Sequence, residues 1–331
     1  MADARYDVIG VGNAIVDVLS PAEDAFLAEH GLDKGVMTLI DGARGTALYD
    51  AMGPAVEVSG GSAANTLAGI ASLGGKGAYI GKVRNDTLGE VFRHDISAIG
   101  VDYRTPAAEG AGEPTARCLI FVTPDAERTM QTCLGVSVEL GPNDIDVDAV
   151  QAAQITYLEG YLFDPPEAKK AFVHAAEAAH AAGRQVALSL SDAFCVDRHR
   201  AEFLHLISGH VDILFANEDE ILSLFEVDSF ERALELTRGH CRIAALTRGA
   251  KGSVILDAAE EYEVPAEPVE KVVDTTGAGD LYAAGVLYGL TSGRELADCA
   301  RLGGIAAAEV IQHYGARPET SLADLARKKG I

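Results

Sequence analysis

The stretch VVDTTGAGDLYAAG, residues 272–285, changes from extended-type to helix-type sequence within a few residues. Two β-branched valines come first, small and polar residues follow, and a helical pattern then predicts a helix over 277–291. Short β-type runs alternate with helical runs in the same way along almost the whole chain. The sequence therefore predicts a doubly wound α/β fold, in which helices flank a mostly parallel sheet.

Several extended runs are apolar throughout, as expected for strands that are covered by helices on both faces. The predicted strands are 6–12, 77–83, 155–160, 185–190, 211–216, 243–247 and 253–256. The predicted helices are 62–73, 87–99, 166–182, 218–225, 230–238, 277–291 and 295–312. We expect one domain over residues 1–331.

Two regions depart from this alternation, at about 14–58 and 101–135. The first holds strand-like pieces, with a convincing helical pattern only over 21–31. The second contains RCLIFVTPDAERTMQTCL, which predicts a hairpin that turns at Pro124-Asp125-Ala126. We interpret both regions as insertions that build a small β-rich lid.

The composition excludes several classes of function. Hydrophobic residues make up 48% of the chain, enough for a buried core, and the formal net charge of −23 argues against nucleic acid or a membrane as a partner. Five scattered cysteines without a CxxC pair are typical of reduced thiols rather than of disulfides or a zinc site. With no signal-peptide core and no apolar run of membrane-spanning length, we expect a cytoplasmic protein.

Two common phosphate-binding motifs do not fit the sequence. GVGNAI (10–15) begins like a dinucleotide fingerprint, but it ends on Ile15 and the following residues look extended rather than helical. Gly75-Lys76 and Gly81-Lys82 lack the spacing and the following Ser or Thr of a Walker A loop.

Gly277-Ala278-Gly279-Asp280 stands at the start of the helix predicted over 277–291. The first amides of a helix have no partners within it and carry the positive end of its dipole. Small residues let an anionic group reach these amides, and Asp280 adds a carboxylate in the same turn. This combination suits phosphoryl transfer to an alcohol, with Asp280 accepting the hydroxyl proton. A glycine turn followed by an acidic first turn explains the tetrapeptide equally well.

DTTGAGD (274–280) and GGSAANTLAGIASLGG (60–75) together resemble the two signature regions of the ribokinase, or PfkB, family of carbohydrate and nucleoside kinases. The likeness covers essentially the whole chain. VDILFANEDE (211–220), LSLSDAF (188–194) and PTARCLIFV (114–122) further resemble the adenosine-kinase branch. The resemblance implies a ribokinase-like fold with a lid. It also implies ATP and Mg²⁺ as cofactors and transfer to a nucleoside 5′-hydroxyl, with adenosine the leading acceptor.

The resemblance also implies roles for individual residues at the acceptor end. Asp280 would be the general base, and the amides around Gly277, Ala278 and Gly279 would neutralise the transferring phosphoryl group. The residues implied to bind the acceptor are Asn13, Asp17, Gly60, Gly61 and Asn65.

At the nucleotide end the implied residues are Asn217, Glu220, Thr247, Gly249 and Gly252. Asn217 and Glu220 would order Mg²⁺ through water molecules rather than bind it directly. A monovalent cation such as K⁺ near Asp274 and Thr276 is a further implication of the family. Each of these nucleotide-end roles has a purely structural alternative. Asn217 and Glu220 would form a strand-to-helix cap with a solvated acid, and the residues around Gly249 would form a tight turn between two strands.

Several alternatives stay open from the sequence. A sugar kinase of the same family would take ribose, fructose or 2-keto-3-deoxygluconate, and a non-catalytic nucleotide-binding regulator would use the fold without the reaction. Residues 35–40 close over an acceptor base or form a core strand of the lid. Arg128 either reaches the phosphates when the lid closes or, as we expect, is a solvated hairpin residue. We expect His199, His205 and His210 to lie on helix surfaces rather than on a metal. The protein is a monomer or a homodimer.

Overall fold

The computed structural model describes residues 4–125 and 127–331. The body contains a nine-stranded sheet with the strand order β14-β13-β12-β11-β10-β9-β1-β5-β6. Neighbouring strands from β12 to β6 are parallel, and β13 and β14 add an antiparallel edge. The strands are β1 (Tyr6–Val11), β5 (Gly77–Ile80), β6 (Asp102–Tyr103), β9 (Ala153–Glu159), β10 (Gln185–Ser189), β11 (Ile213–Asn217), β12 (Ile243–Thr247), β13 (Ser253–Leu256) and β14 (Glu261–Val264).

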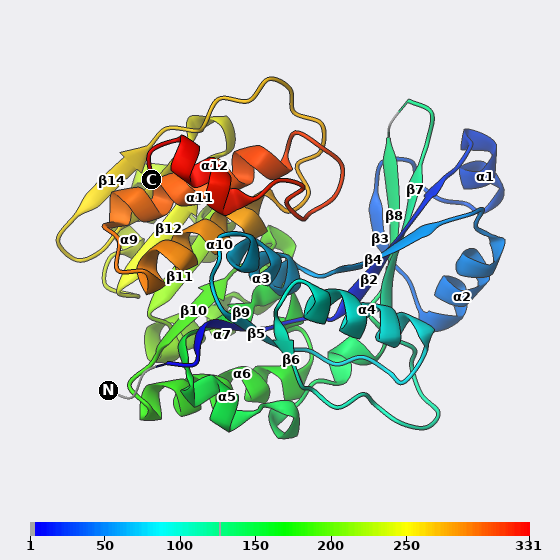
Figure 1. The fold of residues 1–331 in the computed structure, drawn as a ribbon, viewed down its shortest axis with the longest axis horizontal. Coiled ribbons are helices and arrows are strands. Elements are labelled where there is room, and N and C mark those ends of the chain that lie inside the picture. The colour runs from blue at the N-terminus through cyan, green and yellow to red at the C-terminus, as the bar shows by residue number, and fades with distance from the viewer. Residues whose placement is uncertain (1–3, 126) are drawn as a thin grey trace.

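Helices cover both faces of this sheet (Figure 1). In β1, Val8 belongs to one apolar core and its neighbour Ile9 to the other, because successive side chains of a strand point to opposite faces. The first core includes α3 (Ser62–Ser72), α4 (Thr87–Ala98), α10 (Ala278–Thr291), α11 (Leu296–Val310) and α12 (Leu322–Lys328). The second core includes α5 (Val147–Gln151), α6 (Pro166–Ala181), α7 (Ala193–His210), α8 (Glu218–Phe225) and α9 (Phe230–Thr237).

Small residues let α3, α10 and α11 approach one another closely. A Cβ atom at Gly69 of α3 would lie 2.6 Å from the Cβ of Ala284 in α10, and one at Gly285 would lie 2.4 Å from the nitrogen of Gly303 in α11. These contacts fix α10 against α3 near the centre of the molecule (Figure 1).

The lid is a separate five-stranded sheet with the order β3-β8-β7-β2-β4, on the right in Figure 1. Val16 and Val18 of β2 are fully buried on the face that packs into the first core. The lid strands are β2 (Ile15–Pro21), β3 (Met37–Leu39), β4 (Val56–Gly60), β7 (Ala116–Val122) and β8 (Arg128–Cys133), and α1 (Asp24–Glu29) and α2 (Gly42–Ala51) connect them.

The predicted fold class is confirmed: the sheet of the body is mostly parallel, flanked by helices and accompanied by a β-rich lid. The β7–β8 hairpin also forms as predicted. Its turn was predicted at Pro124-Asp125-Ala126, of which Ala126 lies outside the described residues.

One prediction about the lid is wrong, and one of the two alternatives for residues 35–40 is excluded. The sequence indicated helix only over 21–31 in the first insertion, but α2 forms as well, capped by Asp41, which accepts a hydrogen bond from the Arg44 amide at 2.7 Å. Only Gly45 and Leu48 of α2 are buried, so the helix has no apolar stripe to detect. Residues 35–40 do not form a core strand either, because Met37 and Leu39 of β3 are 48% and 57% exposed.

Within the described ranges, no helix has both the length and the apolar character needed to span a bilayer.

Candidate active site

The predicted site residues collect at the carboxyl edge of the parallel strands. Asn13 lies just beyond β1, whereas Asn217 and Thr247 end the adjacent strands β11 and β12. Ligands of open α/β sheets bind in crevices at this edge. The strand order separates two regions: β1 and β9 carry the predicted acceptor end, and β11 and β12 carry the predicted nucleotide end.

Asp280 lies between these regions in the first turn of α10 and is held by the first turn of α3. Its Oδ1 accepts a hydrogen bond from Ser62 Oγ at 2.6 Å, and its Oδ2 accepts one from Asn65 Nδ2 at 3.1 Å. Burial raises the pKa of Asp280, and the two hydrogen bonds oppose that rise because they favour the charged form. A fixed carboxylate with a raised pKa is suited to accept a proton near neutral pH.

The three small residues before Asp280 differ in what the fold requires of them. Gly277 caps α10 with φ at +80°, and a Cβ atom there would lie 2.8 Å from the Cα of Ala316. Within the described chain, a Cβ atom at Gly279 would meet nothing within 4 Å. The Ala278 amide donates to the Thr275 carbonyl oxygen at 3.2 Å. The open space above Gly279 therefore leaves the start of α10 accessible to an anionic group.

Asn13 is 1% exposed, and both the oxygen and the nitrogen of its side-chain amide are hydrogen-bonded within the protein. Its Nδ2 donates to Glu159 Oε1 at 2.9 Å, and its Oδ1 accepts from Ser137 Oγ at 2.9 Å. Binding of an acceptor hydroxyl by Asn13 stays a prediction, because it requires one of these hydrogen bonds to be exchanged.

Glu159, which no sequence motif indicated, ends β9 and is 1% exposed. Its carboxylate accepts from the backbone amide of Asn13 at 3.2 Å and from that of Ala63 at 2.8 Å. Burial raises the pKa of Glu159 to about 7, despite these hydrogen bonds. A Cβ atom at Gly12 would lie 2.3 Å from Glu159 Oε2. Glu159 thus ties the end of β1 to the start of α3. The signal in the sequence was an acidic residue closing a strand that carries no other charge.

Gly60 and Gly61 allow the chain to pass close to the acceptor end. A Cβ atom at Gly60 would lie 2.5 Å from Asp17 Oδ2. Gly61 has φ at +94°, and a Cβ atom there would lie 2.3 Å from the carbonyl oxygen of Asn13. Burial raises the pKa of Asp17 to about 6, whereas the positive charges of Arg317 and Arg128 act against that rise.

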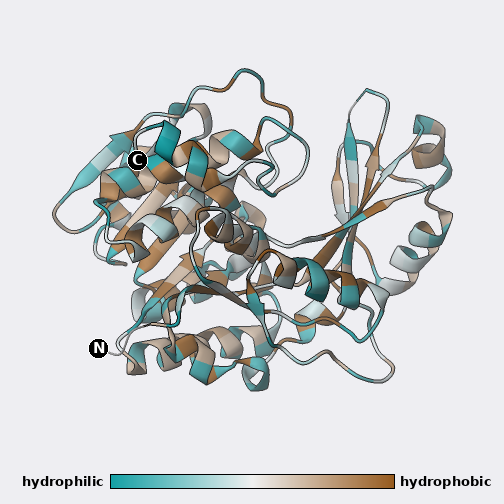
Figure 2. Cartoon of the chain, viewed as in Figure 1, coloured by the Kyte–Doolittle hydropathy of each residue, from teal (hydrophilic) through white to brown (hydrophobic). Residues whose placement is uncertain are grey.

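Asp17 projects from an apolar face of the lid. The register pairs Asp17 with Val58 and Cys118, and it pairs Thr132 with Cys118 and Leu39. Directly paired residues project from the same face of a sheet. Val58 is 37% exposed and Leu39 is 57% exposed. The Asp17 face of the lid comprises Met37, Leu39, Val56, Val58, Cys118 and Thr132 around Asp17. Apolar residues recur along these strands in Figure 2.

Asn217 and Glu220 form a reciprocal cap at the start of α8. The Glu220 amide donates to Asn217 Oδ1 at 2.8 Å, and the Asn217 amide donates to Glu220 Oε2 at 3.0 Å. The cap interpretation of the sequence is correct, but the acid is not solvated, since Glu220 is 5% exposed. Burial raises the pKa of Glu220 to about 7.

These residues fit a hydrated magnesium ion better than a closed protein cage. Among residues 4–125 and 127–331, no group of three or more His, Cys, Asp or Glu side chains could hold a metal ion. Mg²⁺ commonly keeps several waters and relies on substrate phosphates with one or two carboxylates. Glu220, a buried acid at the carboxyl edge, is suited to hydrogen-bond such waters.

Thr247, Gly249 and Gly252 lie in a tight turn between β12 and β13. The Arg248 amide donates to the Gly252 carbonyl oxygen at 2.8 Å, and Gly249 and Gly252 have φ of +55° and +90°. The turn interpretation of the sequence describes this geometry. A nucleotide contact at these residues stays a prediction.

Arg128 of the lid is ion-paired with Asp274 in the segment before α10. Their side chains are only 12% and 8% exposed, so the prediction of a solvated arginine is wrong. Asp274 Oδ1 accepts from the Thr276 hydroxyl at 2.7 Å. Burial alone would raise the pKa of Asp274, but the hydrogen bonds from Thr276 and the charge of Arg128 lower it. A monovalent cation near Asp274 and Thr276 stays a prediction, and it would share this carboxylate with the arginine.

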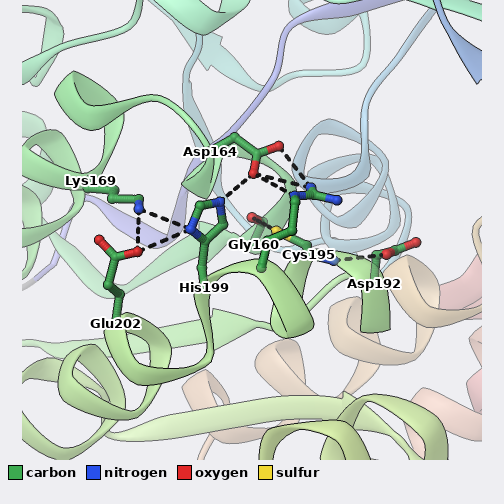
Figure 3. Close-up of polar contacts among 8 residues, drawn as sticks. Gly160, Asp164, Lys169, Asp192, Cys195, His199 and Glu202 are labelled. Atoms are coloured by element: carbon green, nitrogen blue, oxygen red, sulfur yellow. Dashed lines mark hydrogen bonds and ion pairs between the residues drawn. The ribbon is translucent and has the colours of Figure 1, made fainter.

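His199 lies on α7 and is only partly exposed, with 17% of its side chain accessible. Its Nε2 lies 2.5 Å from Asp164 Oδ1 and its Nδ1 lies 3.1 Å from Glu202 Oε2. Figure 3 shows the ring between Asp164 on one side and the Lys169–Glu202 pair on the other. These contacts join α6 and α7 and do not involve the residues around Asp280.

Residues 52–322 match the pfkB family of carbohydrate kinases. The structure is similar to adenosine kinase from Sinorhizobium meliloti, with 55% identity and a TM-score of 0.90 over 99% of this chain and 100% of that chain. It is equally similar to a probable sugar kinase protein from Rhizobium etli CFN 42, with 54% identity and a TM-score of 0.91 over 99% of both chains. The adenosine kinase of Saccharomyces cerevisiae is 26% identical, covering 93% of this chain and 95% of the relative. As its sequence motifs predicted, the chain belongs to the pfkB family of carbohydrate kinases and is a phosphotransferase with an alcohol group as acceptor.

Proposed function

We propose that this enzyme is an adenosine kinase, which transfers the γ-phosphoryl group of ATP to the 5′-hydroxyl of adenosine. Kinases of this family use ATP. The choice of a nucleoside over a free sugar is supported above all by the Asp17 face of the lid, where one carboxylate lies among exposed apolar side chains.

A nucleoside has two chemically different parts, and this face offers a partner to each. The ribose hydroxyls can donate hydrogen bonds to Asp17, and the flat, weakly solvated base can cover Val58 and Leu39. A free sugar carries hydroxyl groups around its whole ring. It would leave these apolar side chains exposed or would place its own hydroxyls against them, which costs free energy.

The similar structures support a kinase but differ on its acceptor. The protein from S. meliloti is named an adenosine kinase, and the one from R. etli is named a probable sugar kinase. Because the two are about equally similar to this chain, the lid chemistry carries more weight in the proposal than either name.

In the proposed reaction, the γ-phosphoryl group lies against the first turn of α10, where Gly279 leaves room for it. Asp280 accepts the proton of the 5′-hydroxyl as that oxygen attacks phosphorus, and Ser62 and Asn65 hold the carboxylate in place. When bound through waters near Asn217 and Glu220, Mg²⁺ would supply charge neutralisation for the phosphates. The Arg128–Asp274 ion pair holds the lid to the body, which favours exclusion of water from the reacting groups.

The test is ADP formation by the purified protein with adenosine, other nucleosides, ribose, fructose or 2-keto-3-deoxygluconate as sole acceptor. We expect kcat/KM to be highest for adenosine. A higher value for a free sugar would reject the proposed acceptor while leaving membership of the family intact.

Leu39→Gln and Val58→Thr test the lid face directly. Both add polar atoms to an exposed apolar surface, so we expect each to raise KM for adenosine several-fold, about 1 kcal/mol of binding, with KM for ATP unchanged. Val36→Thr is the matched control, because Val36 is also exposed on the lid, at 47%, but lies outside the Asp17 face. Equal effects of all three substitutions would argue against a base on this face.

A further inference from the structure

Arg317 lies in the segment between α11 and α12 and takes no part in the mechanism above. Its Nε donates to Asn65 Oδ1 at 3.4 Å. Its Nη2 is buried and has no hydrogen-bond partner in the part of the chain that the structure describes. Protein interiors rarely leave a buried guanidinium donor unpaired. The hydrogen bond to Asn65 is therefore the contact through which Arg317 reaches the site.

We propose that Arg317 is a positioning residue for the general base, and that it acts by fixing the orientation of the Asn65 side chain. The inference rests on the proposed function only in needing an acceptor that the enzyme phosphorylates.

The two ends of the Asn65 amide differ in their hydrogen bonding. Its oxygen only accepts hydrogen bonds and its nitrogen only donates them, although the two ends have nearly the same shape. Arginine only donates, so Arg317 can pair with Oδ1 alone. That pairing leaves Nδ2 directed at Asp280, where it donates at 3.1 Å. If the amide were free to rotate by half a turn, Oδ1 would face the carboxylate and two acceptors would repel each other.

The orientation of Asn65 therefore matters for the protonation of Asp280. A donor to the carboxylate favours its charged form, which is the form that accepts the proton of the substrate. Ser62 also donates to this carboxylate. The other titratable side chains around Asp280 do not favour its charged form, because they are either acids of like charge or neutral tyrosines. They are Asp17 of β2, Glu159 and Tyr157 of β9, and Tyr161 of the following turn. Among these acids, losing the Asn65 donor would raise the pKa of Asp280 further.

The charge of Arg317 also acts on Asp17, where it opposes the rise in pKa that burial causes. Arg317 therefore acts on the proposed acceptor-binding carboxylate as well as on the Asn65 side chain.

The test is a double-mutant cycle with Arg317→Met, Asn65→Ala and the double variant, measured as kcat over pH. We expect Arg317→Met to lower kcat by about 10- to 100-fold, as for a residue that positions a general base, with KM for ATP unchanged. The acidic limb of the pH profile should move to higher pH. In the Asn65→Ala background the same substitution should change kcat by less than about threefold, because residues in one network are not additive.

Arg317→Lys is the conservative control and guards against misfolding of the methionine variant. It keeps the charge and a donor, so we expect it to restore part of the lost rate. Equal losses in the two backgrounds, or an acidic limb that does not move, would overturn the inference.

The outcomes also separate this inference from the proposed function. If the wild-type enzyme prefers a sugar, the acceptor proposal fails, and the same cycle is measured with that sugar. If no acceptor is phosphorylated, the cycle is measured on hydrolysis of ATP by water, for which the same base is needed.

Discussion

At the scale of single residues, the catalytic proposal depends on one carboxylate and its two donors. Asp280→Asn keeps the shape of the side chain but removes the proton acceptor. We expect turnover to fall by a factor of about 10²–10⁴ or more, the usual contribution of a general base, while ATP binding stays nearly unchanged. Single-turnover kinetics and calorimetric titration with a non-hydrolysable ATP analogue measure the two quantities. Near-normal turnover would remove Asp280 from the role of base.

Residues whose contacts are local in the sequence could be predicted, whereas residues whose partners lie far away along the chain could not. Asp280 and its glycines could be recognised because the physics of a helix start is local. Glu159 and Arg317 reach Asn13 and Asn65 from 146 and 252 residues away along the chain. The periodicity of a strand or helix does not indicate contacts of this kind. Arg317 also lies in an irregular segment between two helices, where no sequence pattern distinguishes it from a solvated cation.

At the scale of elements, two glycines near the same helix start serve different purposes. A Cβ atom at Gly69 would collide with Ala284 at 2.6 Å, whereas one at Gly279 meets open space. We expect Gly69→Ala to lower the free energy of unfolding by about 1–3 kcal/mol through overpacking between α3 and α10. Gly279→Ala should leave stability unchanged or slightly higher, but it should raise KM for ATP because the methyl group occupies the approach to the amides.

Denaturant unfolding and ATP titration of this matched pair check the prediction. Loss of stability in Gly279→Ala, or unchanged stability in Gly69→Ala, would contradict the assignment of the first to ligand access and of the second to packing.

The elements themselves were predictable where burial was regular. The central strands are apolar on both faces, so their sequences are distinctive without any knowledge of their neighbours. Edge elements are less distinctive: in β14 only alternate residues are partly buried, and the strand was missed. The helix α2 was missed for the related reason that it buries one large side chain, Leu48.

At the scale of the whole molecule, the buried acids predict an unusual dependence of stability on pH. Burial raises the pKa of Asp17 to about 6 and those of Glu159 and Glu220 to about 7, and it also raises that of Asp280. The pKa of such groups in an unfolded chain is about 4, so the folded state holds their protons more tightly. Their contribution to stability is complete below about pH 4 and is lost as the pH rises through about 6–7.

We therefore expect Tm of the ligand-free protein to be lower at pH 8 than at pH 6. The net charge of −23 acts in the same direction, because repulsion among ionised acids grows with pH. Acids with lowered pKa values, such as Asp274, act in the opposite direction only at lower pH. Calorimetry between pH 5.5 and 8 measures the trend, and Glu159→Gln should flatten it. A Tm that rises with pH over this range would contradict the prediction.

The division between body and lid has a consequence for how new specificities arise. The base and its two donors belong to α3 and α10, whereas Val58 and Leu39 belong to strands inserted between elements of the body. Substitutions in the lid can therefore exchange one acceptor for another while the phosphoryl-transfer groups remain intact. Acceptor specificity can therefore change during evolution through a series of proteins that all keep the groups needed for phosphoryl transfer.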